Sequence, residues 1–139
     1  MAAYALAGCQ SPPQLPNPLR IQVVGEQYYW QFRYPGVDGQ LHTDDDISMA
    51  GPDLHVPVDW PIELEFTSRD YIYVFTQPLL QLNQVAIPDM AFEQTFAAEA
   101  TGAYPFSGDQ LCGIEHESLD GQLVVESAAA FNKWLEKSQ

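Results

Sequence analysis

The clearest strand signal in this chain is Pro61-Ile-Glu-Leu-Glu-Phe-Thr-Ser68, in which apolar and polar side chains alternate. Successive side chains of a β-strand point to opposite faces of the sheet. The alternation therefore predicts a strand that turns Ile62, Leu64 and Phe66 toward a hydrophobic core. The chain on either side of this segment has a similar character.

Short runs rich in Val, Ile, Tyr, Phe and Trp recur along the chain, and these residue types favour strands. The runs cover residues 19–34, 54–58, 71–75, 92–98, 102–106 and 122–126. Residues 35–39 have the composition of a turn, whereas 40–53 and 76–90 are expected to form an exposed loop and an irregular connection. The segment Ala128–Lys137 holds good helix formers and no breaker, which predicts a short terminal helix.

Seven or eight short strands separated by turns predict an all-β protein, a β-sandwich with a short C-terminal helix. Residues 19–139 are expected to form this single domain, because their number suffices for one hydrophobic core. Residues 1–18 are interpreted as a leader and tether, since prolines interrupt regular structure there. These prolines are Pro12, Pro13, Pro16 and Pro18.

The chain is strongly acidic, with 5 Lys and Arg against 19 Asp and Glu and a formal net charge of −14. Nucleic-acid binding requires basic side chains on the phosphates, so no nucleic-acid partner is expected. The acidic surface either keeps the protein soluble or steers a basic partner or a cation toward it. No run of about 18 apolar residues is present, so no segment is expected to span a bilayer.

The segment Leu6-Ala-Gly-Cys9 resembles a bacterial lipobox, in which the cysteine becomes a lipidated N-terminus. The Pro-rich tether that follows suits an anchored domain. The charged and long apolar regions that usually precede such a cysteine are missing, so either the sequence is truncated there or the match is due to chance. Cys9 is the expected lipidation site.

A second cysteine lies in the segment Gly108-Asp-Gln-Leu-Cys-Gly-Ile-Glu-His-Glu-Ser-Leu119, just before the last predicted strand. Cys112 and His116 are four residues apart, which suits a copper site with a thiolate and an imidazole. Two ligands alone hold copper poorly. The alternative makes Cys112 a small buried apolar side chain and His116 a hydrogen-bonded loop residue. Further possible ligands lie on other segments, at His42, His55 and Met90.

Motifs of common enzyme classes are absent from the sequence. It holds no Gly-rich phosphate loop, no Gly-x-Ser-x-Gly and no His-Glu-x-x-His. The acids around Cys112 oppose formation of the thiolate that a Cys–His nucleophile requires. No catalytic residue is therefore expected in this chain.

Four segments taken together carry a family resemblance. They are Val24-Gly-Glu-Gln-Tyr-Tyr-Trp-Gln-Phe-Arg-Tyr34, Thr67-Ser-Arg-Asp70 through Ala86-Ile-Pro88, Leu111-Cys-Gly113 with His116, and Phe131-Asn-Lys-Trp134. In this order they resemble subunit II of cytochrome c oxidase, over about residues 20–136. The resemblance implies a cupredoxin-like Greek-key sandwich, which in typical members carries the binuclear copper A centre.

The resemblance also implies that most of the copper ligands are gone. The family's loop reads Cys-x-Glu-x-Cys-x-x-x-His-x-x-Met, with another His on an earlier strand. Cys112 and His116 match this pattern and are interpreted as vestigial ligands. The departures are Gly108 for the first Cys, Gln110 for the Glu, Leu119 for the Met and Tyr73 for the early His. Without a second thiolate a binuclear site cannot be bridged, so no cofactor is expected in this chain.

A further departure concerns electron entry. Tyr28 stands where the family carries the Trp over which cytochrome c docks, and Trp30 matches the more structural Trp that follows. The simpler interpretation is that Tyr28 and Tyr29 pack the sandwich.

The resemblance thus implies a subunit II of a haem-copper terminal oxidase that has lost copper A, as in quinol oxidases. Its expected partner is subunit I, which would hold haem and copper, and its expected role is structural. Its expected place is the outer face of a bacterial cytoplasmic or thylakoid membrane, held by a lipid anchor. Two alternatives stay open: a lipid-anchored interaction or assembly module, and an electron carrier with a residual mononuclear copper at Cys112 and His116.

Overall fold

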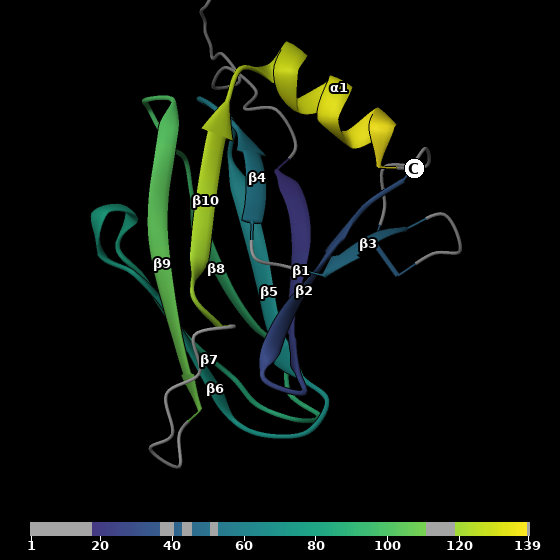
Figure 1. The fold of residues 1–139 in the computed structure, drawn as a ribbon, viewed down its shortest axis with the longest axis vertical. Coiled ribbons are helices and arrows are strands. Elements are labelled where there is room, and N and C mark those ends of the chain that lie inside the picture. Colours follow the sequence, from purple (N-terminus) through teal and green to yellow (C-terminus); the bar gives the residue numbers. More distant parts are fainter. Residues whose placement is uncertain (1–17, 37–40, 43–45, 51–52, 111–118, 139) are drawn as a thin grey trace, which may run out of the picture.

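The computed structural model describes residues 18–36, 41–42, 46–50, 53–110 and 119–138. These residues form ten strands, a short 3-10 helix (η1) and one α-helix (Figure 1). The elements are β1 (Leu19–Glu26), β2 (Tyr29–Tyr34), β3 (Ile47–Ala50), β4 (Asp53–Pro57), β5 (Ile62–Ser68), β6 (Tyr73–Gln77), η1 (Pro78–Leu80), β7 (Leu82–Ala86), β8 (Phe92–Phe96), β9 (Gly102–Gln110), β10 (Gly121–Glu126) and α1 (Ala128–Lys137).

The strands form two sheets of five. The first sheet has the order β3-β2-β1-β5-β8 and the second the order β4-β10-β9-β6-β7. The pairs β1–β5 and β4–β10 are parallel, and the other pairs are antiparallel. This arrangement confirms the predicted all-β sandwich with a short C-terminal helix.

The core lies between the sheets and is built largely from aromatic rings. Ile62, Leu64 and Phe66 of β5 are fully buried, which confirms the prediction from their alternation. Phe66 lies 5.3 Å from the ring of Phe75 in the second sheet, and Phe75 stacks on Phe106 at 4.6 Å. Rings of this size bury much apolar area each, so a few of them fill the space between two sheets.

The outer face of the first sheet carries a charged cluster centred on Arg20. Its guanidinium lies 3.4 Å from Glu63, 3.2 Å from Glu65 and 3.2 Å from Glu93. Burial and the neighbouring charge of Glu93 raise the pKa of the Glu63 carboxyl, although Arg20 opposes this. One arginine thus offsets the repulsion between acids on adjacent strands.

The terminal helix α1 spans the predicted residues and crosses one end of the sandwich beside β4 (Figure 1). Ser127 caps it by accepting a hydrogen bond from the Ala130 N–H, a common way to begin a helix. Phe131 is buried, and Trp134 stacks on the His55 ring at 4.0 Å.

Two sequence-based boundaries in the middle of the chain were wrong. The strand predicted at 71–75 is β6, which begins two residues later, because Tyr71 belongs to a turn around Asp70. The irregular connection predicted at 76–90 contains η1 and β7. β7 forms because its backbone pairs with β6 along its whole length, which its weak alternation did not indicate.

Two other strands were also underestimated. The exposed loop predicted at 40–53 contains β3, which adds an edge to β2. The strand predicted at 102–106 continues to Gln110 as β9, because β6 pairs with its second half. The predictions for Cys9 and the tether before Pro18 lie outside the described residues. Within the described part of the chain, no helix has the length and apolar character needed to cross a membrane.

Candidate functional site

The structure brings together the four described positions that the sequence singled out as lost copper ligands. Tyr73 of β6 lies opposite Gln110 of β9, and Phe75 lies opposite Gly108. Leu119 packs on Gly108, since a Cβ placed on that glycine would lie 2.8 Å from the Leu119 Cβ. The two vestigial ligands, Cys112 and His116, lie outside the described residues.

Tyr73 fills the place expected for the early histidine. Its side chain is fully buried, and its ring lies against the backbone of Gly25 in the first sheet. A Cβ on Gly25 would be 2.3 Å from the Tyr73 Cδ2 atom, so only glycine admits this ring. The phenol donates a hydrogen bond to Asp70 Oδ1 at 2.7 Å and accepts one from the Tyr28 N–H at 3.2 Å. Burial first, and then the hydrogen bond to Asp70, raise the pKa of Tyr73, so the phenol stays neutral.

Asp70 is a site residue that sequence reasoning missed. Besides the Tyr73 hydroxyl, its carboxylate accepts backbone N–H groups from Gln27 and Tyr71, each at 2.7 Å. Burial would raise the pKa of Asp70, but these hydrogen bonds lower it overall. Gln27 and Tyr28 both have left-handed backbones, with φ of 54° and 68°. Asp70 and Tyr73 therefore hold a turn that costs conformational energy for side chains of this size.

At Gly108, the position that the resemblance assigns to the first bridging cysteine, a side chain finds no room. A Cβ there would lie 2.7 Å from the Leu119 carbonyl oxygen and 2.9 Å from the Trp30 Nε1 atom. The same indole N–H donates to the Leu119 carbonyl at 2.9 Å, and the Gly108 N–H donates to Asp120 Oδ1 at 3.2 Å. Hydrogen bonds of the protein itself thus hold the two ends of the 108–119 segment together.

The donor set at these positions does not fit copper A. A neutral hydrogen-bonded phenol, a glycine and a leucine replace imidazole, thiolate and thioether, the soft or nitrogen ligands that copper prefers. Gln110 is buried, and its Oε1 atom has no hydrogen-bond partner among the residues that the structure describes. That amide oxygen is a hard donor and a poor substitute for a thiolate. Among the described residues, no three His, Cys, Asp or Glu side chains are grouped to hold a metal ion.

The other possible ligands are engaged elsewhere or point to solvent. His55 in β4 bonds Glu126 at 2.8 Å and stacks on Trp134. His42 bonds Glu65 at 3.2 Å, and Met90 is half exposed. None of these contacts joins them to Tyr73 or Gly108.

The aromatic residues near this turn differ in their burial. Trp30 is only 1% exposed and contacts Tyr73 at 5.7 Å, so it is a core residue. Tyr28 packs partly against the core and stacks on the exposed Tyr71 at 5.3 Å.

We expect Tyr73→Phe to lower the free energy of unfolding by about 1–3 kcal/mol at neutral pH, because the Tyr28 N–H and Asp70 lose their partner. Asp70 has a lowered pKa in the folded protein. Its contribution is therefore present above the unfolded-state value of about 3.9 and is lost as the pH falls through the folded value. The difference in free energy of unfolding between Tyr73→Phe and the wild type should become smaller below about pH 4.

Urea unfolding at pH 7 and pH 3 measures this difference. Tyr104→Phe is the matched control, because that hydroxyl donates only to the Ala100 carbonyl. A difference for Tyr73→Phe that does not change with pH would contradict the coupling to Asp70.

Gly108→Cys is expected to destabilise the domain by about 1–3 kcal/mol, because its Cβ overlaps the Leu119 carbonyl and the Trp30 indole. Ser107→Cys is the matched control: it is the preceding residue of β9 and is exposed, so its effect should stay within about 0.5 kcal/mol. Urea unfolding under reducing conditions compares the two. Equal stabilities would show that a thiolate can be accommodated at position 108.

Comparisons with known proteins identify the family to which this chain belongs. Residues 19–128 match the family model described as cytochrome c oxidase subunit II, periplasmic domain. Cytochrome c oxidase subunit 2 of Synechocystis is 30% identical over 92% of this chain and 36% of the relative. The alternative cytochrome c oxidase subunit 2 of Bradyrhizobium diazoefficiens is 25% identical over 86% of this chain and 50% of the relative.

A solved structure shows the same fold. The periplasmic domain of subunit II of cytochrome oxidase from Bradyrhizobium japonicum superposes with a TM-score of 0.74 and 25% identity, over 90% of this chain and 96% of that one. The chain spans about a third to a half of the curated relatives it matches. The chain thus belongs to the family of the periplasmic domain of cytochrome c oxidase subunit II.

Proposed function

We propose that this domain serves as subunit II of a haem-copper terminal oxidase in which copper A is lost, and that its role there is structural. The observation that carries the proposal is the packing at Gly108 and Tyr73. The space that a second thiolate and an imidazole would need is filled by the Leu119 backbone, the Trp30 indole and the Tyr73 ring.

The two family ligands that the sequence keeps, Cys112 and His116, also support the proposed loss of copper A. Cys112 and His116 alone supply one thiolate and one imidazole. A blue copper site requires two histidines and a cysteine, and a binuclear site requires two bridging thiolates. The described residues beside the 108–119 segment offer neither the second histidine of a blue site nor the second thiolate of a binuclear site.

A domain without copper A cannot relay electrons from a soluble donor to subunit I. We therefore propose that electrons enter subunit I directly from membrane quinol, and that subunit I holds the haem and copper of the complex. The replacement of the docking Trp by Tyr28 is consistent with this, because no entry port is required. The domain would dock on the outer face of subunit I and shield it.

We further propose that Cys9 carries a lipid that holds the domain at the outer, periplasmic or lumenal, side of the membrane. The support is the lipobox-like Leu6-Ala-Gly-Cys9 and the Pro-rich stretch after it. A single acyl chain gives marginal attachment, whereas two or three chains hold stably.

Titration of the full chain with Cu(II) tests the loss of the centre. We expect no intense thiolate-to-copper absorption in the visible, because one thiolate and one imidazole do not form a closed site. The Cys112→Ser variant is the matched control and should give the same spectrum as the wild type. A stoichiometric blue or purple product that Cys112→Ser abolishes would overturn the proposal.

Co-purification from native membranes tests the subunit role. The domain, solubilised in mild detergent, is expected to carry a haem-containing subunit I with it, detectable by its haem absorption. Recovery of the domain without any haem protein would favour the alternative of a free-standing lipid-anchored interaction module.

A further inference from the structure

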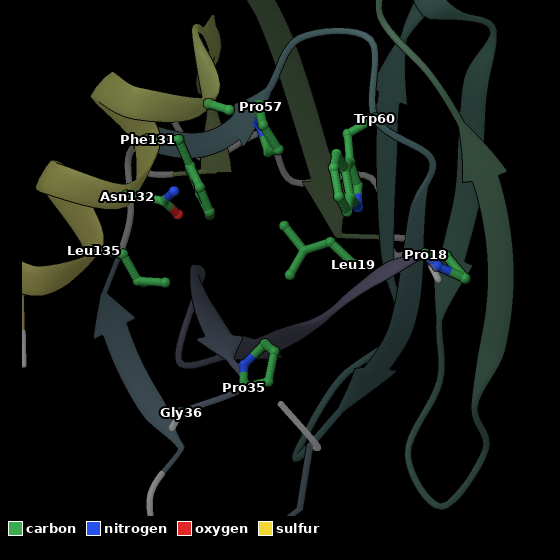
Figure 2. A pocket seen from close by; sticks show the side chains of 10 residues that line it. Pro18, Leu19, Pro35, Gly36, Pro57, Trp60, Phe131, Asn132 and Leu135 are labelled. Atoms are coloured by element: carbon green, nitrogen blue, oxygen red, sulfur yellow. The ribbon is translucent and has the colours of Figure 1, made fainter. Parts of the chain in front are cut away.

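An apolar groove of about 360 Å³ lies between α1 and the start of β1 (Figure 2). α1 follows the C-terminal end of β10, whereas Leu119 precedes its N-terminal end. Phe131 and Leu135 of α1 form one wall, and Trp60, from the turn between β4 and β5, forms the facing wall. Leu19 projects between these walls, and Pro35 lies at the base (Figure 2). The groove takes no part in the site described above.

The lining of this groove is unusual for so acidic a domain. Among the described residues that line it, none is charged, although the chain has a net charge of −14. Three of its members are prolines, and Trp60 is 38% exposed. Asn132 offers an amide beside these apolar groups. Grooves lined by aromatic rings and prolines are the type that receives extended proline-rich segments.

We propose that this groove binds the chain's own residues 11–17, Ser-Pro-Pro-Gln-Leu-Pro-Asn, which immediately precede Pro18 in the sequence. These residues lie outside the described part of the chain, but the next one, Pro18, is exposed and lines the groove. The groove is therefore a docking surface for the tether of the same molecule.

The composition of the segment fits the groove. Its prolines favour the polyproline II conformation, which leaves backbone carbonyls unpaired and available to the Asn132 amide. The segment carries Leu15 and three prolines but no charge; indeed, the first charged side chain of the whole chain is Arg20. An uncharged segment avoids the desolvation cost that an acid would meet between Trp60 and Leu135.

Distance and connectivity also favour this occupant. Seven residues in polyproline II conformation extend about 22 Å, at about 3.1 Å per residue. A short linker gives a local concentration of about 1 mM. A segment that binds in trans with a dissociation constant of about 0.1 mM would then occupy the groove about 90% of the time in cis.

Docking would fix the orientation of the domain relative to the part of the chain before residue 11. If Cys9 carries the proposed lipid, a docked tether would keep the α1 end of the sandwich toward the membrane. The docking itself does not depend on the lipid, on subunit I or on the loss of copper, so it can fail or succeed independently of them.

The test uses the full chain labelled with 15N, and follows the indole N–H resonance of Trp60, assigned with Trp60→Phe. Leu15→Asp places a charge in the proposed contact and should move this resonance, together with the backbone resonances of Leu135. Ala3→Asp adds the same charge outside the segment and should leave both unchanged. Position 15 lies before β1, so the substitution changes no residue of a strand or helix. The other backbone resonances report whether the fold is intact.

A synthetic peptide of residues 10–18, added to Leu15→Asp, should return the Trp60 resonance toward its wild-type position at about 0.1 mM peptide. Three results would overturn the proposal. They are an unchanged Trp60 resonance in Leu15→Asp, an equal change in Ala3→Asp, and a wild-type resonance that moves on dilution, which would make a second copy the occupant.

Discussion

Two aromatic rings that each lie against a glycine of the opposite sheet hold the loop end of this sandwich together. Tyr73, from the second sheet, packs on Gly25 of the first, and Trp30, from the first sheet, packs against Gly108 of the second. In neither place would a Cβ fit. Because protein interiors are close-packed, each ring fixes the spacing of the sheets around it. The rest of the site depends on this reciprocal packing.

Hydrogen bonds complete what the packing begins. The Trp30 indole holds Leu119, and the Tyr73 phenol ties Asp70 to the strained turn at Tyr28. Typical relatives are expected to hold a metal beside these strands, and in this domain the described side chains there bond to one another. Buried polar groups that are fully paired specify one arrangement of a core. Gln110 is the exception, because its amide oxygen has no partner in the described part of the chain.

The opposite end of the molecule is organised differently. There α1 closes the sandwich through Phe131 and through the stack of Trp134 on His55, and leaves the apolar groove beside Trp60. Charged groups gather on the outer face of the first sheet, where Arg20 joins three carboxylates. Part of the acidity therefore serves the sheet itself, whereas steering of a basic partner stays a prediction.

The sequence by itself determined the fold class, the terminal helix and the family. The alternation along β5 and the order of several motifs can be recognised without any information about tertiary contacts. It also marked the four positions that the structure groups at one end of β6 and β9. Only the tertiary structure decided β3 and β7, whose weakly patterned residues become strands because a neighbour's backbone pairs with them. It alone disclosed Asp70 and the glycine contacts of Tyr73 and Trp30. The space available to a side chain depends on residues that are distant along the chain, so a local sequence pattern cannot predict it.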